Sequence, residues 1–261
     1  MRLRTLLRAL ASVALGCAAS TLTMVAPAAA QDSEWPARAV KVIVPYGAGS
    51  TPDYAARIIA ERLQRRFGKP FVVENKPGAS GMLGTDAVAK ATPDGYTIGV
   101  AIAGPLSTNT LLYRKMPYDP GRDLVPLTQL VSQPSVLVVH PDVPAATLKE
   151  LIVELKRRPG QYNYASFGNG SISHLTMELL ASKSGTRMVQ VPYPGSPQAV
   201  AAVVSGDTPI ACLPAAAVMP QVRAGKLRAL AQTLPKRSKL LPDLPTMIEE
   251  GMADVQADAW I

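Results

Sequence analysis

Cysteine and histidine are scarce in this chain of 261 residues, which contains two of each. One cysteine, Cys17, falls in an N-terminal segment that we expect to be removed, so no internal disulfide is predicted. The other, Cys212, lies in the apolar run Ile210–Leu213 and is interpreted as a small buried hydrophobe. Residues with metal-ligand spacing do not cluster anywhere in the sequence. We therefore predict no metal, no cofactor and no catalytic residue.

Aromatic residues make up 5% of the chain, too few to predict stacking on nucleic-acid bases. The formal net charge is +8, and it falls to +5 without the first thirty residues, which carry three arginines and no acid. The remaining cations are scattered and are typical of solvated helix ends. Neither a complete dinucleotide-binding fingerprint nor a Gly-Lys-Ser/Thr phosphate loop occurs. No nucleic-acid partner is predicted.

The first thirty residues have the pattern of a secretory signal peptide. Arg2, Arg4 and Arg8 form a basic start, residues 9–25 are mainly apolar, and small residues precede a cleavage site ahead of Gln31. Serine, threonine and glycine interrupt the apolar stretch, which argues against a membrane span. Lipid anchoring at Cys17 matches the usual signal poorly, although the sequence does not exclude it. We expect an exported, periplasmic protein.

Short apolar segments alternate with helical patterns along the mature chain. This alternation predicts an α/β fold of two lobes, with mostly parallel sheets and flanking helices. The predicted strands are 40–44, 71–74, 97–101, 135–139, 162–165, 188–191, 209–213 and 227–231, and the predicted helices are 53–67, 84–91, 148–158, 173–182, 197–205 and 215–224. Thr147-Leu-Lys-Glu150 is a capping box and marks a helix start.

Three strand ends lead through Gly-bearing loops into helices. The first runs from Val44 to Asp53, where Thr51 is the expected N-cap, Pro52 the first helical residue and Asp53 a first-turn acid. The second covers Ser166–His174, and the third Val191–Ser196. Each aims backbone N–H groups and a positive helix end at one spot, which suits a carboxylate or a phosphate. Facing each other across a cleft, such loops would hold a small acid without a buried arginine.

Eight ordered motifs carry a family resemblance. They are Ile43-Val-Pro-Tyr-Gly-Ala-Gly49, Val73-Glu-Asn-Lys-Pro-Gly-Ala-Ser-Gly81, the run 84–97, Met116-Pro-Tyr-Asp-Pro120, Tyr164-Ala-Ser-Phe-Gly-Asn-Gly170, Val191-Pro-Tyr193, the run 224–231 and Leu241-Pro-Asp-Leu-Pro-Thr246. Together they resemble the Bug family, the periplasmic substrate-binding receptors of tripartite tricarboxylate transporters. The resemblance implies a type II periplasmic-binding fold that closes on a small organic acid like a Venus flytrap. It also implies a monomer that delivers its ligand to a membrane permease.

Ligand-binding positions carried over from the family lie mainly in the three loops. The resemblance implies contact with the ligand for Tyr46, Ala48, Gly49, Ser50, Asp53, Gly78, Gly81, Ser166, Gly168, Asn169, Ser171, Ser173, His174, Tyr193, Gly195, Ser196 and Leu213. Each has a structural alternative: Asp53 as a partner of its helix dipole, Tyr193 as a wall, Asn169 as a turn residue and His174 as a cap or packed ring.

The chain departs from the family pattern at three places. Pro52 replaces a residue with an N–H and a hydroxyl, which removes one donor. Cys212, Leu213 and Pro214 stand where the family commonly places a polar residue, which favours a compact aromatic or aliphatic acid. The family also continues beyond Ile261, so we expect a truncated product with an uncovered apolar patch.

Two lobes are expected, one from residues 31–125 plus 232–261 and the other from residues 126–231. Hinges are expected near residues 118–133 and 227–233. Three alternatives to a transport receptor stay open at this point: a ligand sensor for a signalling partner such as a sensor kinase, a secreted α/β hydrolase, and a nonfunctional remnant. The hydrolase has little support, since no Gly-x-Ser-x-Gly elbow occurs and only His140 and His174 could act as bases.

Overall fold

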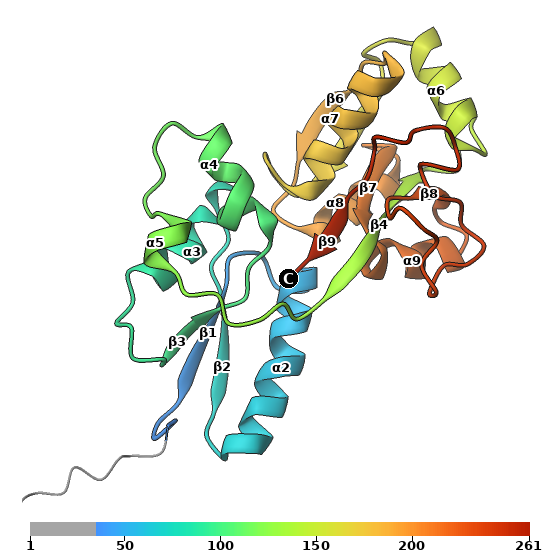
Figure 1. Ribbon diagram of the computed structural model, residues 1–261. Helices are drawn as coiled ribbons and strands as arrows, with labels where there is room; N and C mark the ends of the chain where they lie inside the picture. Colours follow the sequence, from blue (N-terminus) through green and yellow to red (C-terminus); the bar gives the residue numbers. More distant parts are fainter. Residues whose placement is uncertain (1–34) are drawn as a thin grey trace, which may run out of the picture. The chain divides into compact units, whose positions relative to one another are not determined.

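The computed structural model describes residues 35–261, so the predicted signal peptide and Cys17 lie outside the described residues. The compact unit Arg38–Ile261 contains the helices and strands of this part. It has two β-sheets, both flanked by helices (Figure 1). The α/β fold class predicted from the sequence is confirmed.

The first sheet has three parallel strands in the order β2-β1-β3. These are β1 (Val40–Val44), β2 (Phe71–Asn75) and β3 (Thr97–Gly99). Helix α2 (Thr51–Phe67) packs on β1 and β2, and α3 (Met82–Ala89) packs on β1 and β3. A short 3-10 turn, η1 (Ala79–Gly81), precedes α3.

The second sheet has the order β6-β5-β7-β4-β8, and β9 pairs with the start of β4. Its strands are β4 (Ser132–Val139), β5 (Asn163–Ser166), β6 (Val189–Pro192), β7 (Ile210–Pro214), β8 (Arg228–Gln232) and β9 (Asp258–Trp260). Its helices are α6 (Leu148–Arg157), α7 (Ile172–Ser184), α8 (Ser196–Ser205) and α9 (Ala215–Arg223). β4 runs antiparallel to β7, β8 and β9, which the alternation of elements did not predict.

Strand β4 is buried on both faces and divides the apolar interior into two clusters. Val136 and Val138 belong to a cluster that includes Val42 and other residues of the first sheet. Leu137 and Val139 point the other way, into a cluster under α6 and α7 that also contains Cys212. Cys212 is fully buried, and this burial raises the pKa of its thiol to about 12. Its interpretation as a core residue is confirmed.

Most predicted elements occur within a few residues of their expected bounds, and two helix starts are informative. Thr147 caps α6 as expected, because its hydroxyl accepts the N–H of Glu150 at 3.2 Å. Helix α2 begins one residue earlier than expected, with Ser50 and not Thr51 as its N-cap. The π-helical turn η2 (Gly104–Thr108), α4 (Asn109–Leu112) and α5 (Pro120–Asp123) were not predicted.

The last thirty residues pack beside the second sheet. The amide of Gln232, which is fully buried, donates to the carbonyls of Leu241 and Leu244, and Met247 is buried in the cluster under α6 and α7. β9 then pairs antiparallel with the start of β4. We expected residues 232–261 to join the first lobe, and the two-lobe boundaries stay a prediction.

Candidate functional site

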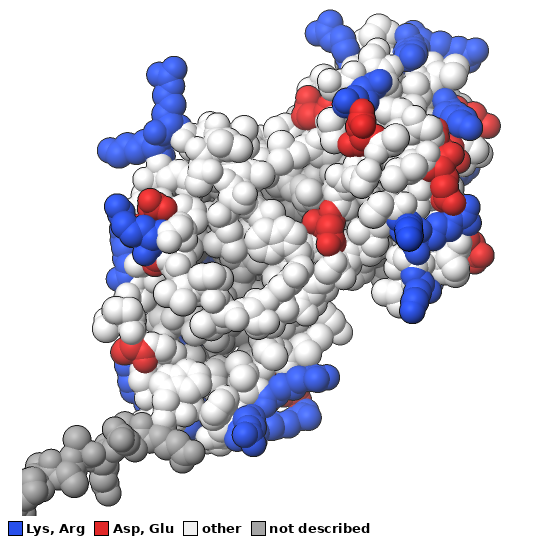
Figure 2. All heavy atoms as spheres, in the orientation of Figure 1, with Lys and Arg blue, Asp and Glu red and all other residues white. Residues whose placement is uncertain are grey.

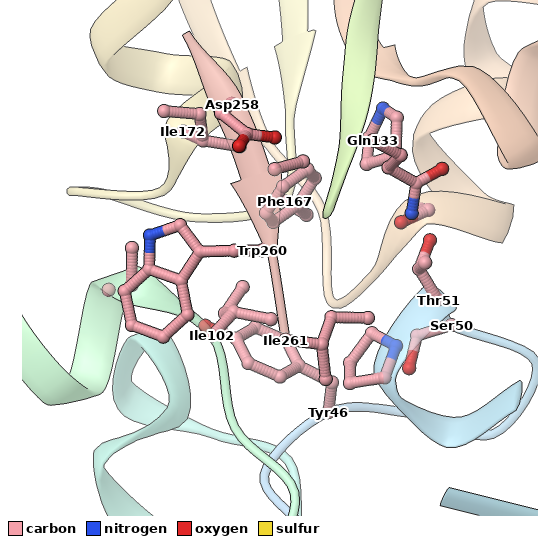
Figure 3. A pocket seen from close by; sticks show the side chains of 16 residues that line it. Tyr46, Ser50, Thr51, Ile102, Gln133, Phe167, Ile172, Asp258, Trp260 and Ile261 are labelled. Carbon is pink, nitrogen blue, oxygen red and sulfur yellow. The ribbon is translucent and has the colours of Figure 1, made fainter. Parts of the chain in front are cut away.

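The strand–loop–helix units converge on one pocket of Arg38–Ile261. Sixteen residues line it: Tyr46, Ser50, Thr51, Pro52, Ile102, Ala103, Gly104, Gln133, Phe167, Ile172, Ser196, Pro214, Asp258, Ala259, Trp260 and Ile261. Figure 3 shows Ser50 and Thr51 on one side and Trp260 and Ile102 on the other, with Phe167 and Ile261 between them in this view. The cavity itself has a volume of about 30 Å³, and the empty space is about 490 Å³ when open solvent at the mouth is included.

Ser50 and Thr51 bring the start of α2 to this pocket. Ser50 is 1% exposed, and its hydroxyl oxygen is buried without a hydrogen-bond partner in the described structure. The first N–H groups of a helix also have no partner within the helix. The Ser50 hydroxyl and these N–H groups are donors of the kind that an anion accepts.

Tyr46 connects the pocket with both sheets. Its hydroxyl donates to the carbonyl of Ser80 at 3.4 Å, and its ring meets Phe167 edge-on at 6.4 Å between centroids. Burial raises the pKa of Tyr46 well above its usual range, so the hydroxyl stays protonated and acts as a donor. Gly81 lies directly behind the ring, where a Cβ atom would come within 3.0 Å of the tyrosine oxygen.

Asp53 does not line the pocket, although it was predicted to contact the ligand. Its Oδ2 atom accepts the Gly49 N–H at 2.8 Å and the Arg57 Nε–H at 3.0 Å, and its Oδ1 atom accepts the Asn75 amide at 2.9 Å. Burial raises the pKa of this carboxyl, but these hydrogen bonds and the charge of Arg57 outweigh burial and lower it. Ala48 and Gly49 are exposed and also lie outside the pocket lining.

The second loop uses most of its hydroxyls internally. Ser171 caps α7 by accepting the N–H of His174 and donates to the carbonyl of Gly168, and Ser173 accepts the N–H of Phe167. Ser166 is buried and accepts hydrogen bonds from Gln190 and, at 3.4 Å, from Gly168. The side chains that this loop presents to the pocket are Phe167 and Ile172, which the sequence reading passed over.

His174 supports this loop from within. Its Nδ1 atom accepts the Gly170 N–H at 3.1 Å, which requires an unprotonated Nδ1. Burial lowers the pKa of the imidazole, and the nearby Glu178 opposes this shift. Asn169 is exposed and does not line the pocket.

The third loop reaches the pocket through Ser196, the first residue of α8, which is 5% exposed. A Cβ atom added to Gly195 would lie 3.8 Å from the Cβ atom of Ser50, so the starts of α8 and α2 are adjacent. The hydroxyl of Tyr193 is instead hydrogen-bonded to that of Thr208 at 2.7 Å, and Tyr193 is not among the residues that line the pocket. The two helix N-termini thus meet at one spot.

The last three predicted positions lie outside the pocket lining. Gly78 is exposed at the start of η1, and Gly81 is buried behind Tyr46. Leu213 is fully buried in the apolar cluster that joins the two sheets, and it is Pro214, the next residue, that lines the pocket. Adjacent residues of a strand face opposite sides, so Leu213 and Pro214 have opposite orientations.

The sequence reading missed Gln133, Trp260 and Ile261, which come from β4 and the end of the chain. They are distant in sequence from the three loops, and no motif marks them. Gln133 accepts the Ala216 N–H at 3.2 Å. Asp258, also missed, accepts the hydroxyl of Ser132 at 2.7 Å.

No lysine or arginine is among the described residues that line the pocket. Figure 2 shows a largely uncharged middle of this face, with basic side chains toward its margins. An anion at this site would be bound by N–H groups and hydroxyls, with apolar side chains around the rest of the ligand.

In residues 35–261, no group of three or more histidine, cysteine or acidic side chains is placed to hold a metal ion. The same residues contain no helix with the length and apolar character needed to cross a bilayer.

Comparison with known proteins identifies the family. Residues 55–261 match the model of the tripartite tricarboxylate transporter family receptor. The chain is 37% identical over 247 residues to protein BugT of Bordetella pertussis, covering 94% of this chain and 75% of BugT.

Two solved structures from Rhodopseudomonas palustris are also similar. Rpa4515, described with adipate, is 35% identical with a TM-score of 0.85. The match covers 87% of this chain and 76% of the Rpa4515 chain. MatC, described with bound malate, is 31% identical with a TM-score of 0.82. The match covers 87% of this chain and 77% of the MatC chain. The predicted resemblance is confirmed: the chain belongs to the Bug family of periplasmic solute-binding receptors, a family of receptors and not of enzymes.

Proposed function

We propose that this receptor closes on a small organic carboxylate at the adjoining N-termini of α2 and α8 and delivers it to the membrane permease of a tripartite tricarboxylate transporter. The observation that carries the proposal is the Ser50 hydroxyl, buried and unpartnered at the start of α2, in a pocket that Ser196 at the start of α8 also lines. A carboxylate oxygen would accept this hydroxyl and the first-turn N–H groups.

The walls of the pocket favour a ligand with an apolar body. Ile102, Phe167, Pro214 and Trp260 surround the region beyond the two helix starts. An aliphatic or aromatic acid would bury its carbon skeleton against them, whereas a tricarboxylate would bury charges without a cation in the lining. The adipate described with Rpa4515 has this kind of carbon chain, which supports the proposal.

Thermal unfolding of residues 31–261 tests the function. The panel contains adipate, malate, benzoate and citrate, with 1,6-hexanediol as an uncharged match for adipate. A true ligand at 100 times its Kd stabilises the native state by about 2.7 kcal/mol. We expect one aliphatic or aromatic acid to raise the midpoint and the diol to leave it unchanged. A cooperative transition that no acid moves would contradict the proposal.

Ser50→Ala then tests the site. Loss of one charge-assisted hydrogen bond is expected to weaken binding of the selected acid by about tenfold, which is ~1.4 kcal/mol. Ser135→Ala is the matched control, because Ser135 also has a buried, unpartnered hydroxyl but lies outside the pocket lining. Equal affinity in the two variants would rule out Ser50 as a ligand contact.

A further inference from the structure

The carboxylate of Asp53 joins both ends of the first loop, residues 46–50. Its Oδ2 atom holds the Gly49 N–H at 2.8 Å, near the end of this loop. Its Oδ1 atom accepts a hydrogen bond from Nδ2 of Asn75 at 2.9 Å. The same Nδ2 atom also donates to the carbonyl of Tyr46 at 3.0 Å, at the start of the loop. Asp53 therefore holds the Gly49 end directly and contacts the Tyr46 end through Asn75.

Arg57 balances the charge of this carboxylate. It lies one turn further along α2 and approaches both oxygens of Asp53 at 3.0 Å, while its other contact is the side-chain oxygen of Asn75 at 3.2 Å. An uncompensated aspartate in the first turn would repel an anion that approaches the same helix end. Paired with Arg57 and absent from the pocket lining, Asp53 leaves the helix end attractive to an anion.

We propose that Asp53 is a positioning residue for the ligand site: it fixes the first loop so that the Ser50 hydroxyl and the start of α2 face the pocket. This inference rests on the proposed carboxylate function. Gly49 adopts a positive φ of +76°, a conformation with several alternatives for glycine, so the loop needs an external hold on this residue. The hydrogen bond from the Gly49 N–H to Asp53 supplies it.

Asp53→Ala should release the Gly49 end and leave the Tyr46 end held by Asn75. Arg57 stays half exposed, with 54% of its side chain accessible, so the variant leaves no buried unpaired charge. We expect a folded protein whose affinity for adipate or malate, whichever stabilises the wild type, falls by at least tenfold. Asp53→Asn keeps a side-chain oxygen for the Gly49 N–H and should recover part of the affinity.

Glu61→Ala is the matched control. Glu61 forms an ion pair with Arg65 at the same i,i+4 spacing on the same helix, far along α2 from the loop. Its removal should leave the affinity unchanged. An effect of Asp53→Ala that came only from a weaker helix would appear in this control as well.

The exchange rate of the Gly49 amide proton, measured by NMR without ligand, separates positioning from general stability. We expect a slow rate in the wild type, Asp53→Asn and Glu61→Ala, and a rate near that of a free loop in Asp53→Ala. Unchanged exchange in Asp53→Ala, or unchanged affinity for the acid, would overturn the proposal. If the wild type binds no acid, the proposed function is contradicted instead. The exchange rates of the Gly49 amide would still show whether Asp53 holds Gly49 in place. If Asp53→Ala does not fold, full affinity and fast Gly49 exchange in Asp53→Asn would overturn the inference.

Discussion

Gly170 is held on both sides in the second loop. Its N–H is accepted by Nδ1 of His174 at 3.1 Å, and its carbonyl accepts the hydroxyl of Thr108 at 2.7 Å. Its φ of +72° is left-handed, and a Cβ atom there would come within 2.5 Å of the Leu112 side chain. The left-handed φ and this close approach favour glycine here, and the hydrogen bond of its N–H depends on an unprotonated Nδ1 of His174.

The stability contributed by His174 should depend on pH. Because burial lowers its pKa in the folded state, the unfolded chain takes up the proton first as the pH falls. This contribution is complete above the ordinary histidine pKa of about 6.5 and is lost below it, toward the lower pKa of the folded state. We expect urea unfolding at pH 7.5 and 5.5 to show a larger loss for the wild type than for His174→Asn, which keeps an acceptor near Nδ1 but does not titrate. Parallel losses would contradict this role.

Asp53 should give a second pH effect, at lower pH. Its pKa is lowered in the folded state, so its stabilisation is complete above the ordinary aspartate pKa of about 3.9 and is lost as the pH falls through the folded-state value. We expect the stability advantage of the wild type over Asp53→Asn to shrink below pH 4. Acid titration of both proteins by circular dichroism checks this, and a constant difference down to pH 2.5 would be evidence against it.

At the scale of elements, the residues at the helix N-termini determine where the helices begin. Helices α2 and α8 both have proline in their first turn, and α6 and α7 have hydroxyl caps. These signals are local, so the sequence located the helices well. The cap of α6 is the most complete: Thr147 accepts the Glu150 N–H, and Glu150 accepts the Ala146 N–H at 2.6 Å.

Thr147→Ala should therefore destabilise the protein by about 1 kcal/mol, the usual loss for a helix cap. Chemical unfolding checks the value, with the exposed neighbour Lys149 changed to alanine as the control. Because α6 lies outside the pocket lining, ligand affinity should stay at the wild-type level in both variants. A loss below 0.3 kcal/mol would mean that α6 does not need this cap.

Contacts between the sheets matter at the scale of the whole unit Arg38–Ile261. The hydroxyl of Thr108, which comes after β3 of the first sheet, donates a hydrogen bond to the carbonyl of Gly170, which comes after β5 of the second sheet. Ser80 lies beside Gly168, because a Cβ atom added to this glycine would come within 3.3 Å of the Ser80 hydroxyl. The adjoining starts of α2 and α8 likewise come from opposite sheets. Closing of the site on a ligand would have to keep these contacts or form them.

Thr108→Val should speed ligand release a few-fold, because it removes the hydrogen bond to Gly170 and keeps the shape of the side chain. Stopped-flow displacement of the bound acid measures the rate. The control is Thr110→Val, whose lost hydrogen bond joins Thr110 to Ser107 in the same turn. Equal release rates in the two variants would show that the contact between the sheets does not hold the ligand-bound state.

Sequence patterns predicted what depends on neighbouring residues and missed what depends on distant ones. The strands, most helices and the family followed from local periodicity and ordered motifs. The antiparallel β4 could not be predicted, since its long apolar run does not reveal its direction. Asp53 was predicted to contact the ligand. Its hydrogen bond to the Gly49 N–H has no signal in the sequence, because it depends on how the loop folds back. Trp260 reaches the pocket only through the pairing of β9 with β4.

The burial of Cys212 has a practical consequence. A chain that starts at Gln31 contains this one thiol, which is fully buried and has its pKa raised to about 12, so maleimide reagents should not modify the native protein. Cysteines introduced at exposed positions such as Arg62 on α2 and Lys156 on α6 would then be the reactive sites. Fluorophores attached there would report the distance between the two sheets in single molecules, with the native cysteine left in place.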